Sequence, residues 1–350
     1  MKTKILLLII STLLLSLTVR FVIPSEVEIT IDQKSRQRGV CWVGGRQVVT
    51  EKDFESLKKN NVNWISQTPF AWQRSFSDPE IRMNTNSERV WWGESDLGIA
   101  ETTQIARKLN IRTLLKPHLW IRDSWPGEVK MENEEKWNEW FANYKTFIIH
   151  YARLAETNRI EIFCIGTELS NASAHDTDWR KLIREIRKVY SGQLTYAANF
   201  HGEFEKIKFW DALDFIGVQA YFSLSQKNNP TTQELMANWT HHLNSVENIH
   251  KKYDKPILFT EIGYRSTDDA AIEPWKWPQE NKEAVSSAET QAKCYEAFFN
   301  TAWKKPWLAG AYFWKWYPHR SNRLLEIDFT PQGKLAEKIL MDNFSNHYDQ

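Results

Sequence analysis

The segment 161–171, EIFCIGTELSN, places a glutamate directly behind a buried strand. Residues 160–165 are apolar except for Glu161, and their short and β-branched side chains predict an interior strand. Glu168 follows at the carboxyl end of this strand. Burying a carboxylate is costly, so its position needs a reason. The segment 256–263, PILFTEIG, has the same form and ends its strand with Glu261.

Further strands and helices alternate along the rest of the chain. The other predicted strands cover 39–43, 62–65, 111–115, 193–198, 215–220 and 309–313. The predicted helices cover 50–60, 95–109, 134–156, 176–190, a short segment near Phe204, 232–253, 287–303 and 333–344. This alternation predicts a parallel sheet, and eight strands are the number that closes a barrel. We therefore expect one α/β domain over 38–344 with the (β/α)8 TIM-barrel fold.

Loop lengths differ between the two ends of the predicted barrel. Helix-to-strand connections have one or two residues, as at 60–61 and 254–255. Strand-to-helix connections are long, notably 66–94, 117–132, 221–231 and 262–286. Long loops in a compact domain are usually functional, and barrel enzymes build their sites at the carboxyl ends of the strands. The sequence therefore predicts a site at that end.

The first residues have the pattern of a targeting segment. Lys2 and Lys4 precede an apolar run over 5–19, which Arg20 ends. Such a run fits a signal-peptide core and is short for a spanning helix. We expect residues 1–23 to be a signal peptide or an N-terminal membrane anchor, 24–37 a linker and 345–350 a tail. The protein is then exported (periplasmic, cell-surface or secreted), either free or anchored by residues 5–23.

Composition narrows the possible partners. A net charge of +1, from 45 basic and 44 acidic residues, argues against a nucleic-acid partner. The 3 cysteines and 9 histidines show no metal-ligand spacing, so no metal or other cofactor is predicted. The 18 tryptophans exceed what helix and strand packing requires, and indole rings stack on the C–H faces of sugars. A polysaccharide or oligosaccharide is the expected partner.

The two strand-end glutamates suit the hydrolysis of a glycosidic bond. On strands four and seven of one barrel they face each other across its mouth. One carboxylic acid would protonate the leaving oxygen, and the other carboxylate would attack the anomeric carbon or activate water. Tyr221 ends strand six, next to strand seven. A hydrogen bond from its hydroxyl would keep Glu261 ionised, which makes Glu261 the nucleophile and Glu168 the acid and later the base.

The motifs FCIGTELS, VQAYF, ILFTEIGY and AYFWKW together resemble those of retaining (β/α)8-barrel glycoside hydrolases, most closely glycoside hydrolase family 113. The characterised members of that family are β-1,4-mannanases. The resemblance implies that Glu168 is the acid/base and Glu261 the nucleophile, that Tyr221 is its hydrogen-bond partner, and that Trp314 or Trp316 forms a sugar platform. Much of the superfamily has an asparagine before the acid/base, where this chain has Thr167.

Other residues at strand ends or in the long loops are candidate substrate contacts, although each has an alternative structural role in the core or with the backbone. They are His118, Trp120, Asn199, Trp42 and Trp72. The expected function is a retaining endo-β-1,4-mannanase. The alternatives are a β-glucanase or exo-β-glycosidase on the same scaffold, and a non-catalytic carbohydrate-binding barrel.

Overall fold

The computed structural model describes residues 35–83, 90–122, 124–280, 283–319 and 326–345. The predicted signal or anchor segment, 1–23, lies outside these residues, as do most of the predicted linker and tail. Within the described ranges, no helix is both long enough and apolar enough to cross a membrane.

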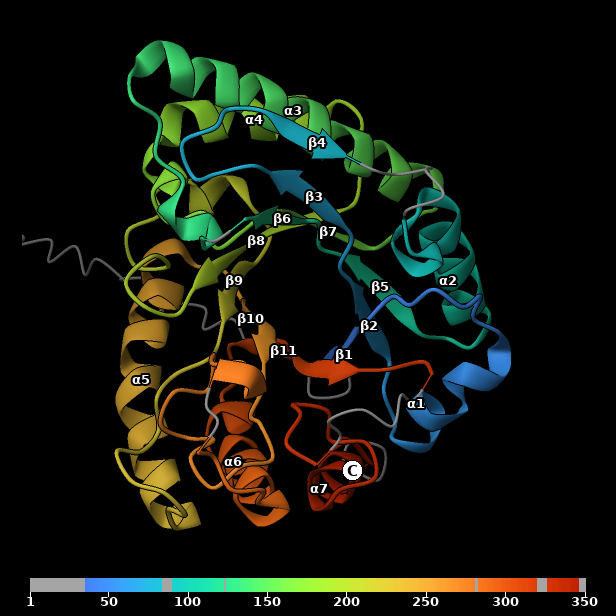
Figure 1. Cartoon of the computed structure of the whole chain (residues 1–350), viewed down its shortest axis with the longest axis vertical. Helices are drawn as coiled ribbons and strands as arrows, with labels where there is room; N and C mark the ends of the chain where they lie inside the picture. The colour runs from blue at the N-terminus through green and yellow to red at the C-terminus, as the bar shows by residue number, and fades with distance from the viewer. Residues whose placement is uncertain (1–34, 84–89, 123, 281–282, 320–325, 346–350) are drawn as a thin grey trace, which may run out of the picture.

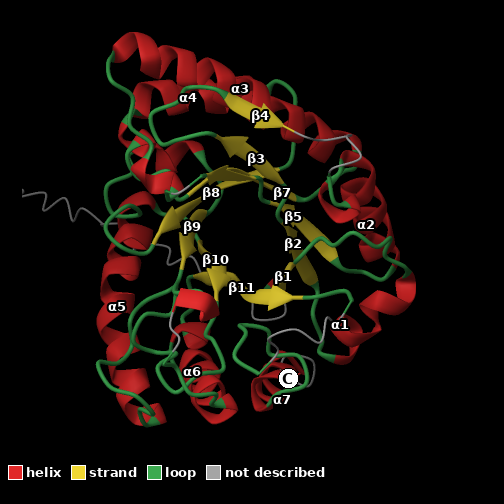
Figure 2. Cartoon of the chain, in the orientation of Figure 1, coloured by secondary structure: helices red, strands yellow, loops and turns green. Residues whose placement is uncertain are grey.

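Eight parallel strands form a closed barrel, with helices around its outside (Figures 1 and 2). Around the ring they are β1 (Gln37–Trp42), β2 (Trp64–Gln67), β5 (Arg112–Leu115), β7 (Ile162–Thr167), β8 (Gln193–Asn199), β9 (Ile216–Gln219), β10 (Ile257–Ile262) and β11 (Leu308–Trp316). β11 pairs back to β1 and closes the barrel. The eight predicted strands and the single α/β barrel are therefore confirmed. β1 begins at Gln37, inside the segment expected to be a linker.

The helices follow the predicted order with two differences. The α-helices are α1 (Glu55–Lys59), α2 (Asp96–Lys108), α3 (Glu134–Thr157), α4 (Asp176–Arg187), α5 (Thr232–Tyr253), α6 (Ala288–Asn300) and α7 (Leu335–Ser345). The first predicted helix is divided into the 3-10 helix η2 (Glu51–Phe54) and the short α1. The prediction of a helix near Phe204 is wrong, because turns occupy that segment and the 3-10 helix η6 (Phe209–Ala212) follows it.

Further single 3-10 turns lie in the connections: η3 (Trp92–Glu94), η4 (Pro126–Glu128), η5 (Ala172–Ala174), η7 (Pro278–Glu280) and η8 (Ala302–Lys304). Side chains before the long helices fix where these begin. Asn133 accepts a hydrogen bond from the Lys136 amide at 2.9 Å, and Ser95 accepts one from the Gly98 amide at 3.0 Å. These caps satisfy amides that have no partner within the helix.

A second, three-stranded sheet stands on the rim of the barrel, and we call it the rim sheet. It consists of β4 (Ile81–Met83), β3 (Phe70–Gln73) and β6 (His118–Ile121), in that order. β3 continues β2 beyond Pro69, and β6 continues β5 beyond Pro117. Proline has no amide proton and interrupts a strand ladder, which explains why each strand is divided there. The sequence pattern predicts loops for both segments, so these two short strands differ from the prediction.

The core has two parts, one inside the barrel and one between the strands and the helices. Cys41, Leu114, Ile162, Leu258 and Tyr312 belong to the part inside the barrel. The aromatic stripe of α3 lies in the outer part, where Trp140 and Tyr144 stack with ring centroids 4.9 Å apart. These aromatic residues of α3 therefore pack the helix against the barrel, as their 3.6-residue spacing predicts.

Candidate active site

A cavity of about 1130 Å³ opens at the carboxyl ends of the barrel strands, and we call it the mouth cavity. Both strand-end glutamates line it, on β10 and directly after β7. The predicted site residues that join them in its wall are Tyr221, Asn199, His118, Trp120 and Trp314. Trp125, Trp275 and Trp277, which the sequence analysis did not single out, also line it. The long loops therefore bring apolar rings around two carboxyl groups.

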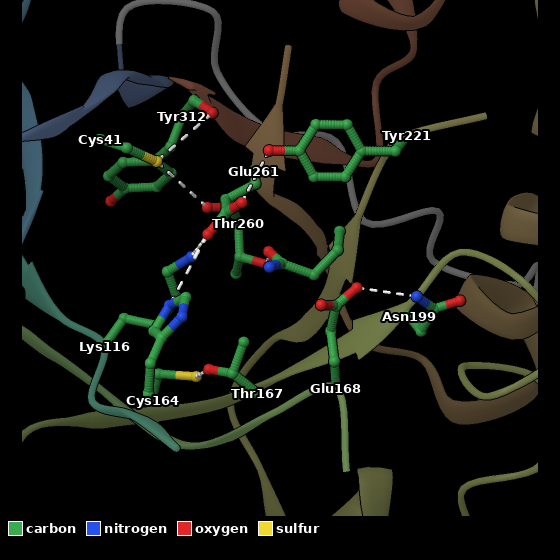
Figure 3. A network of polar contacts seen from close by, with 12 residues as sticks. Cys41, Lys116, Cys164, Thr167, Glu168, Asn199, Tyr221, Thr260, Glu261 and Tyr312 are labelled. Carbon is green, nitrogen blue, oxygen red and sulfur yellow. Dashed lines mark hydrogen bonds and ion pairs between the residues drawn. The ribbon is translucent and has the colours of Figure 1, made fainter. Parts of the chain in front are cut away.

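Glu261 is held by groups that follow two other barrel strands. It belongs to β10 and is almost completely buried. The Tyr221 hydroxyl, just beyond β9, donates a hydrogen bond to Glu261 Oε2 at 2.7 Å. The Lys116 ammonium, just beyond β5, forms an ion pair with Glu261 Oε1. In Figure 3 these two donors approach the carboxylate from different sides.

These partners determine the ionisation of Glu261. Burial alone raises the pKa of a carboxyl group, but the positive charge of Lys116 and the hydrogen bonds from Lys116 and Tyr221 outweigh it and lower the pKa of Glu261 below its ordinary value of 4.5. Burial alone would lower the pKa of Lys116. The negative charge of the nearby Glu261 carboxylate outweighs burial and raises the pKa of Lys116 above its ordinary value. The pair is therefore ionised at neutral pH.

Lys116 is a site residue that sequence reasoning missed. Its side chain is completely buried, at the boundary between the barrel interior and the mouth cavity. The available signal resembles the one that identified the glutamates: Lys116 directly follows the predicted strand 111–115, which ends in Leu114 and Leu115. A buried lysine requires an anion as strongly as a buried glutamate requires a donor or a cation.

Glu168 has different surroundings from Glu261. Its backbone has the left-handed conformation, with φ of 53°, and its amide donates to the Ala197 carbonyl at 2.8 Å. A left-handed conformation is strained for a residue with a side chain and is common at functional sites. Asn199 Nδ2 donates to Glu168 Oε1 at 2.7 Å, and Trp125 Nε1 donates to Oε2 at 3.3 Å (Figure 3 shows the first bond). No cation pairs with Glu168 in the described part of the chain.

The ionisation of Glu168 therefore differs from that of Glu261. Burial raises the pKa of Glu168 to about 7, and the negative charge of Glu261 contributes to the rise. The hydrogen bonds from Asn199 and Trp125 act in the opposite direction but are weaker. Near neutral pH one glutamate of the mouth cavity can thus carry a proton while the other is ionised. This division is what acid-and-nucleophile chemistry requires.

A buried hydrogen-bond network holds the Glu168 loop against β8. The Tyr196 hydroxyl accepts from the Leu169 amide at 2.9 Å and donates to Glu203 Oε1 at 2.5 Å. Glu203 Oε2 accepts from the Asn199 amide at 2.7 Å. Since Leu169 follows Glu168 and Asn199 contacts it, this network fixes both the glutamate and its donor. Glu203 and Tyr196 were not among the predicted site residues.

His118 lies near Glu261 and forms an ion pair with it only when the imidazole is protonated. Its Nε2 is 3.7 Å from Glu261 Oε1. Burial and the adjacent Lys116 charge lower the pKa of His118 to about 3, so the imidazole is neutral at neutral pH. His118 Nε2 has no hydrogen-bond partner within the described residues. His118 lines the mouth cavity, and this unpartnered nitrogen is buried beside Glu261.

The predicted tryptophans separate into cavity-lining and buried groups. Trp314 and Trp120 line the mouth cavity, and Trp72 lies beside Trp120 on the rim sheet with the ring centroids 5.9 Å apart. Trp42 and Trp316 are buried between the barrel and α1, so their prediction as substrate contacts is wrong. The rings of Trp42 and Phe54 stack with their centroids 4.5 Å apart. Trp316 Nε1 donates a hydrogen bond to Ser56 Oγ at 3.3 Å.

Two further features bear on the chemistry. The described residues contain no cluster of three or more histidine, cysteine, aspartate or glutamate side chains able to hold a metal ion. Thr167, which precedes Glu168, is buried with its hydroxyl 3.9 Å from the Cys164 sulfur. The amide nearest Glu168 comes instead from Asn199 on the neighbouring strand.

Comparisons with known proteins extend this description. Residues 44–332 match the model of Glycoside Hydrolase Family 113. A structure of a family 113 β-mannanase from Alicyclobacillus acidocaldarius, in complex with ManMIm, aligns with 27% identity and a TM-score of 0.77, covering 89% of this chain and 98% of that one. A second family 113 β-1,4-mannanase aligns with 26% identity and a TM-score of 0.75, covering 89% and 99%.

More distant structures share only the fold. The β-glucuronidase from Ruminococcus gnavus aligns with 13% identity and a TM-score of 0.59, over 88% of this chain and 49% of its own. A search of curated proteins finds no match. The family model matches the chain from just after β1 to beyond β11, including both strand-end glutamates, and the chain therefore belongs to glycoside hydrolase family 113.

Proposed function

We propose that this glycoside hydrolase is an endo-β-1,4-mannanase that cleaves with retention, with Glu261 as nucleophile and Glu168 as acid/base. The observation that carries the proposal is the opposite shift of the two carboxyl pKa values within one cavity. The substrate follows from the family and from the two aligned structures, which are described as β-mannanases. Every proton and electron pair comes from the two carboxyl groups, the sugar and water, so the reaction needs no cofactor.

In the first step, Glu261 attacks the anomeric carbon while the glycosidic C–O bond breaks. Glu168 gives its proton to the departing oxygen, so the leaving sugar departs as a neutral alcohol. The electron pair of the broken bond stays on that oxygen, and Glu261 forms an ester with the anomeric carbon. Tyr221 and Lys116 hold Glu261 ionised before the attack and orient it toward the cavity.

The second step uses the same groups with reversed protonation. Once Glu261 is esterified its negative charge is gone, and that charge was one of the causes of the raised pKa of Glu168. The pKa of Glu168 therefore falls when the group must act as a base. Glu168 takes a proton from water, the resulting oxygen attacks the anomeric carbon, and Glu261 leaves as a carboxylate. Two inversions at one carbon give net retention.

Substrate and stereochemistry are tested together. Incubation with β-1,4-mannan, β-glucan and xylan should release short oligosaccharides mainly from mannan. NMR of the first product should show the β-anomer before mutarotation, because two displacements restore the configuration. Retaining enzymes hold their carboxyl groups about 5–5.5 Å apart, which leaves no room for a water between Glu261 and the sugar. An α-anomer as first product would exclude Glu261 as nucleophile. Release of oligosaccharides from β-glucan alone would show that the proposed mannan substrate is wrong.

The Tyr221 hydroxyl gives a separate prediction. The wild-type profile should have its basic limb near pH 7, where Glu168 loses its proton, and its acidic limb below pH 4.5, where Glu261 gains one. Tyr221→Phe removes a hydrogen bond to a charged group, worth about 1.5–3 kcal/mol. The rate should fall about ten- to a hundredfold, and the acidic limb should move to higher pH. An unchanged acidic limb in the pH profile of kcat/KM would contradict this role.

A further inference from the structure

The outer face of the rim sheet carries two matching columns of side chains. β3 and the residue after it read Phe70, Ala71, Trp72, Gln73, Arg74, and β6 with its next residue reads His118, Leu119, Trp120, Ile121, Arg122. At alternate positions, each column has a phenyl or imidazole ring (Phe70 or His118), then a tryptophan, then an arginine. The strands are parallel, with Phe70 opposite His118 and Trp72 opposite Trp120. Alternate residues of paired strands share a face, so the two columns stand side by side.

The inner face of the same sheet is packed against the protein. Ala71, Leu119 and Ile121 are buried in the outer core, and Gln73 Oε1 accepts a hydrogen bond from Trp140 of α3 at 3.0 Å. The tryptophans of the outer face are in contrast 45% exposed at Trp72 and 51% exposed at Trp120. The folded chain therefore leaves one face of a well-anchored sheet with two half-exposed indole rings.

A second cavity, of about 390 Å³, lies over this face, and we call it the rim cavity. Its walls include Trp72, Trp120, Arg74, Arg122, Glu80 and Arg82. Trp120 also lines the mouth cavity, so the two cavities meet at this ring. Two residues along a strand span about 6.6 Å. Trp120 thus lies about one pyranose ring beyond His118, whose Nε2 is 3.7 Å from Glu261.

The polar groups of the rim cavity are suited to hydroxyl groups. Arg82 lies opposite Trp72 on β4 and is held by Glu80 through two bonds of 2.7 and 2.9 Å. Within the described residues, Arg74 and Arg122 form no ion pair with a carboxylate. Guanidinium groups beside aromatic rings donate to hydroxyls while the rings contact the C–H faces of a sugar. The lining carboxylates of Asp78 and Glu80 disfavour an anionic ligand and the three arginines disfavour a cationic one, so the cavity suits an uncharged ligand.

We propose that the rim cavity is a distal subsite for one hexose unit of the same β-linked chain whose neighbouring units occupy the mouth cavity. The proposal rests on the proposed function and adds to it a determinant of chain length. Trp72 is the diagnostic residue, because it contacts the rim cavity and does not line the mouth cavity. Trp120 contributes to both, so its replacement would not separate the two sites.

Trp72→Ala should lower kcat/KM for mannohexaose on the order of tenfold relative to kcat/KM for mannotriose, because a lost stacking surface costs about one power of ten in binding. The measured quantity is the hexaose-to-triose ratio, which a general loss of folded protein would leave unchanged. Arg74→Ala should lower the same ratio less. Trp91→Ala is the matched control, because Trp91 is 43% exposed and lines neither cavity. The guanidinium carbon of Arg46 lies 5.7 Å from the centroid of the Trp91 ring.

The outcomes separate this proposal from the proposed function. If the wild-type protein cleaves mannohexaose and Trp72→Ala keeps the wild-type ratio, the distal subsite is overturned and the mannanase activity stands. If the wild-type protein cleaves neither oligosaccharide, the proposed substrate is wrong. The subsite is then judged by calorimetric binding of cellohexaose, a β-linked chain of hexose units, to the wild-type protein. Weaker binding by Trp72→Ala than by Trp91→Ala would support it, and equal binding, or no binding of this sugar, would overturn it.

Discussion

Glu261→Ala should abolish turnover, and added azide should restore part of it. Removing the covalent nucleophile of a hydrolase costs on the order of 10⁴-fold or more in rate. Azide fits the space of the missing carboxylate and attacks the anomeric carbon from the same face, so the product should be an α-glycosyl azide. The measurement is rate against azide concentration on an activated aryl β-mannoside, with NMR identification of the product.

Glu168→Ala is the matched comparison, because it removes the other carboxyl group of the mouth cavity. This variant should keep much of its first-step rate on substrates whose leaving groups need no proton, and lose it on mannan. Azide should here give a β-glycosyl azide, formed on the glycosyl–enzyme ester in place of hydrolysis. If the two products were exchanged between the variants, the assigned roles of Glu168 and Glu261 would be reversed.

Lys116→Met should produce the second large effect, through the ionisation of Glu261. Removing one member of a buried ion pair costs about 3–5 kcal/mol, because the other charge is left buried without a partner. In this variant, burial dominates and raises the pKa of Glu261, so the nucleophile holds a proton at pH values where the wild type is ionised. The rate near pH 6 should fall by about two to three powers of ten. The acidic limb of the kcat/KM profile should move to higher pH.

Stability should change with pH in a matching way. In the wild type the folded pKa of Glu261 is below its ordinary 4.5, so its contribution is present above that pH and is lost as the pH falls through the folded pKa. In Lys116→Met the folded pKa is above the unfolded one, so the contribution is present below the unfolded pKa and lost as the pH rises through the folded one. Urea unfolding should therefore show a larger deficit for the variant at pH 7 than at pH 4.

Lys315→Met provides the control for Lys116→Met. Lys315 is also buried and pairs with Asp328 at 3.4 Å, but it does not contact either glutamate. Its replacement should destabilise the protein and leave the acidic limb of the rate profile in place. A Lys116→Met profile with the same acidic limb as the Lys315→Met profile would show that Lys116 supports the fold and not the ionisation of Glu261.

The barrel was predictable from the sequence because its signals are repeated along the chain. Most barrel strands contain a short apolar run, and the long loops follow the strands and not the helices. The same pattern identified Glu168 and Glu261 as strand-end carboxylates, and strand order alone placed Tyr221 beside Glu261. These predictions use local pattern and chain order, which a single sequence contains.

The features that were missed depend on contacts between distant segments. The rim sheet consists of strands of three or four residues that follow prolines, and its pairing between 70–73 and 118–121 cannot be read from either segment alone. Trp42 and Trp316 have the same local sequence character as tryptophans that line a cavity. The register pairs Trp42 of β1 with Trp316 of β11, and the contacts of their rings with Phe54 and Ser56 place both against η2 and α1. Lys116 could be recognised as a site residue only from its ion pair with Glu261, which lies 145 residues further along the chain.

The rim sheet also affects the entropy of substrate binding. A cleft wall made of loops loses backbone freedom each time a ligand orders it, at about 1–2 kcal/mol for every residue that becomes fixed. Here β3 and β6 extend hydrogen-bonded barrel strands, and Gln73 is tied to α3, so this backbone is already ordered in the free enzyme. That freedom is lost once, when the chain folds, and a long substrate meets a preorganised surface at every turnover.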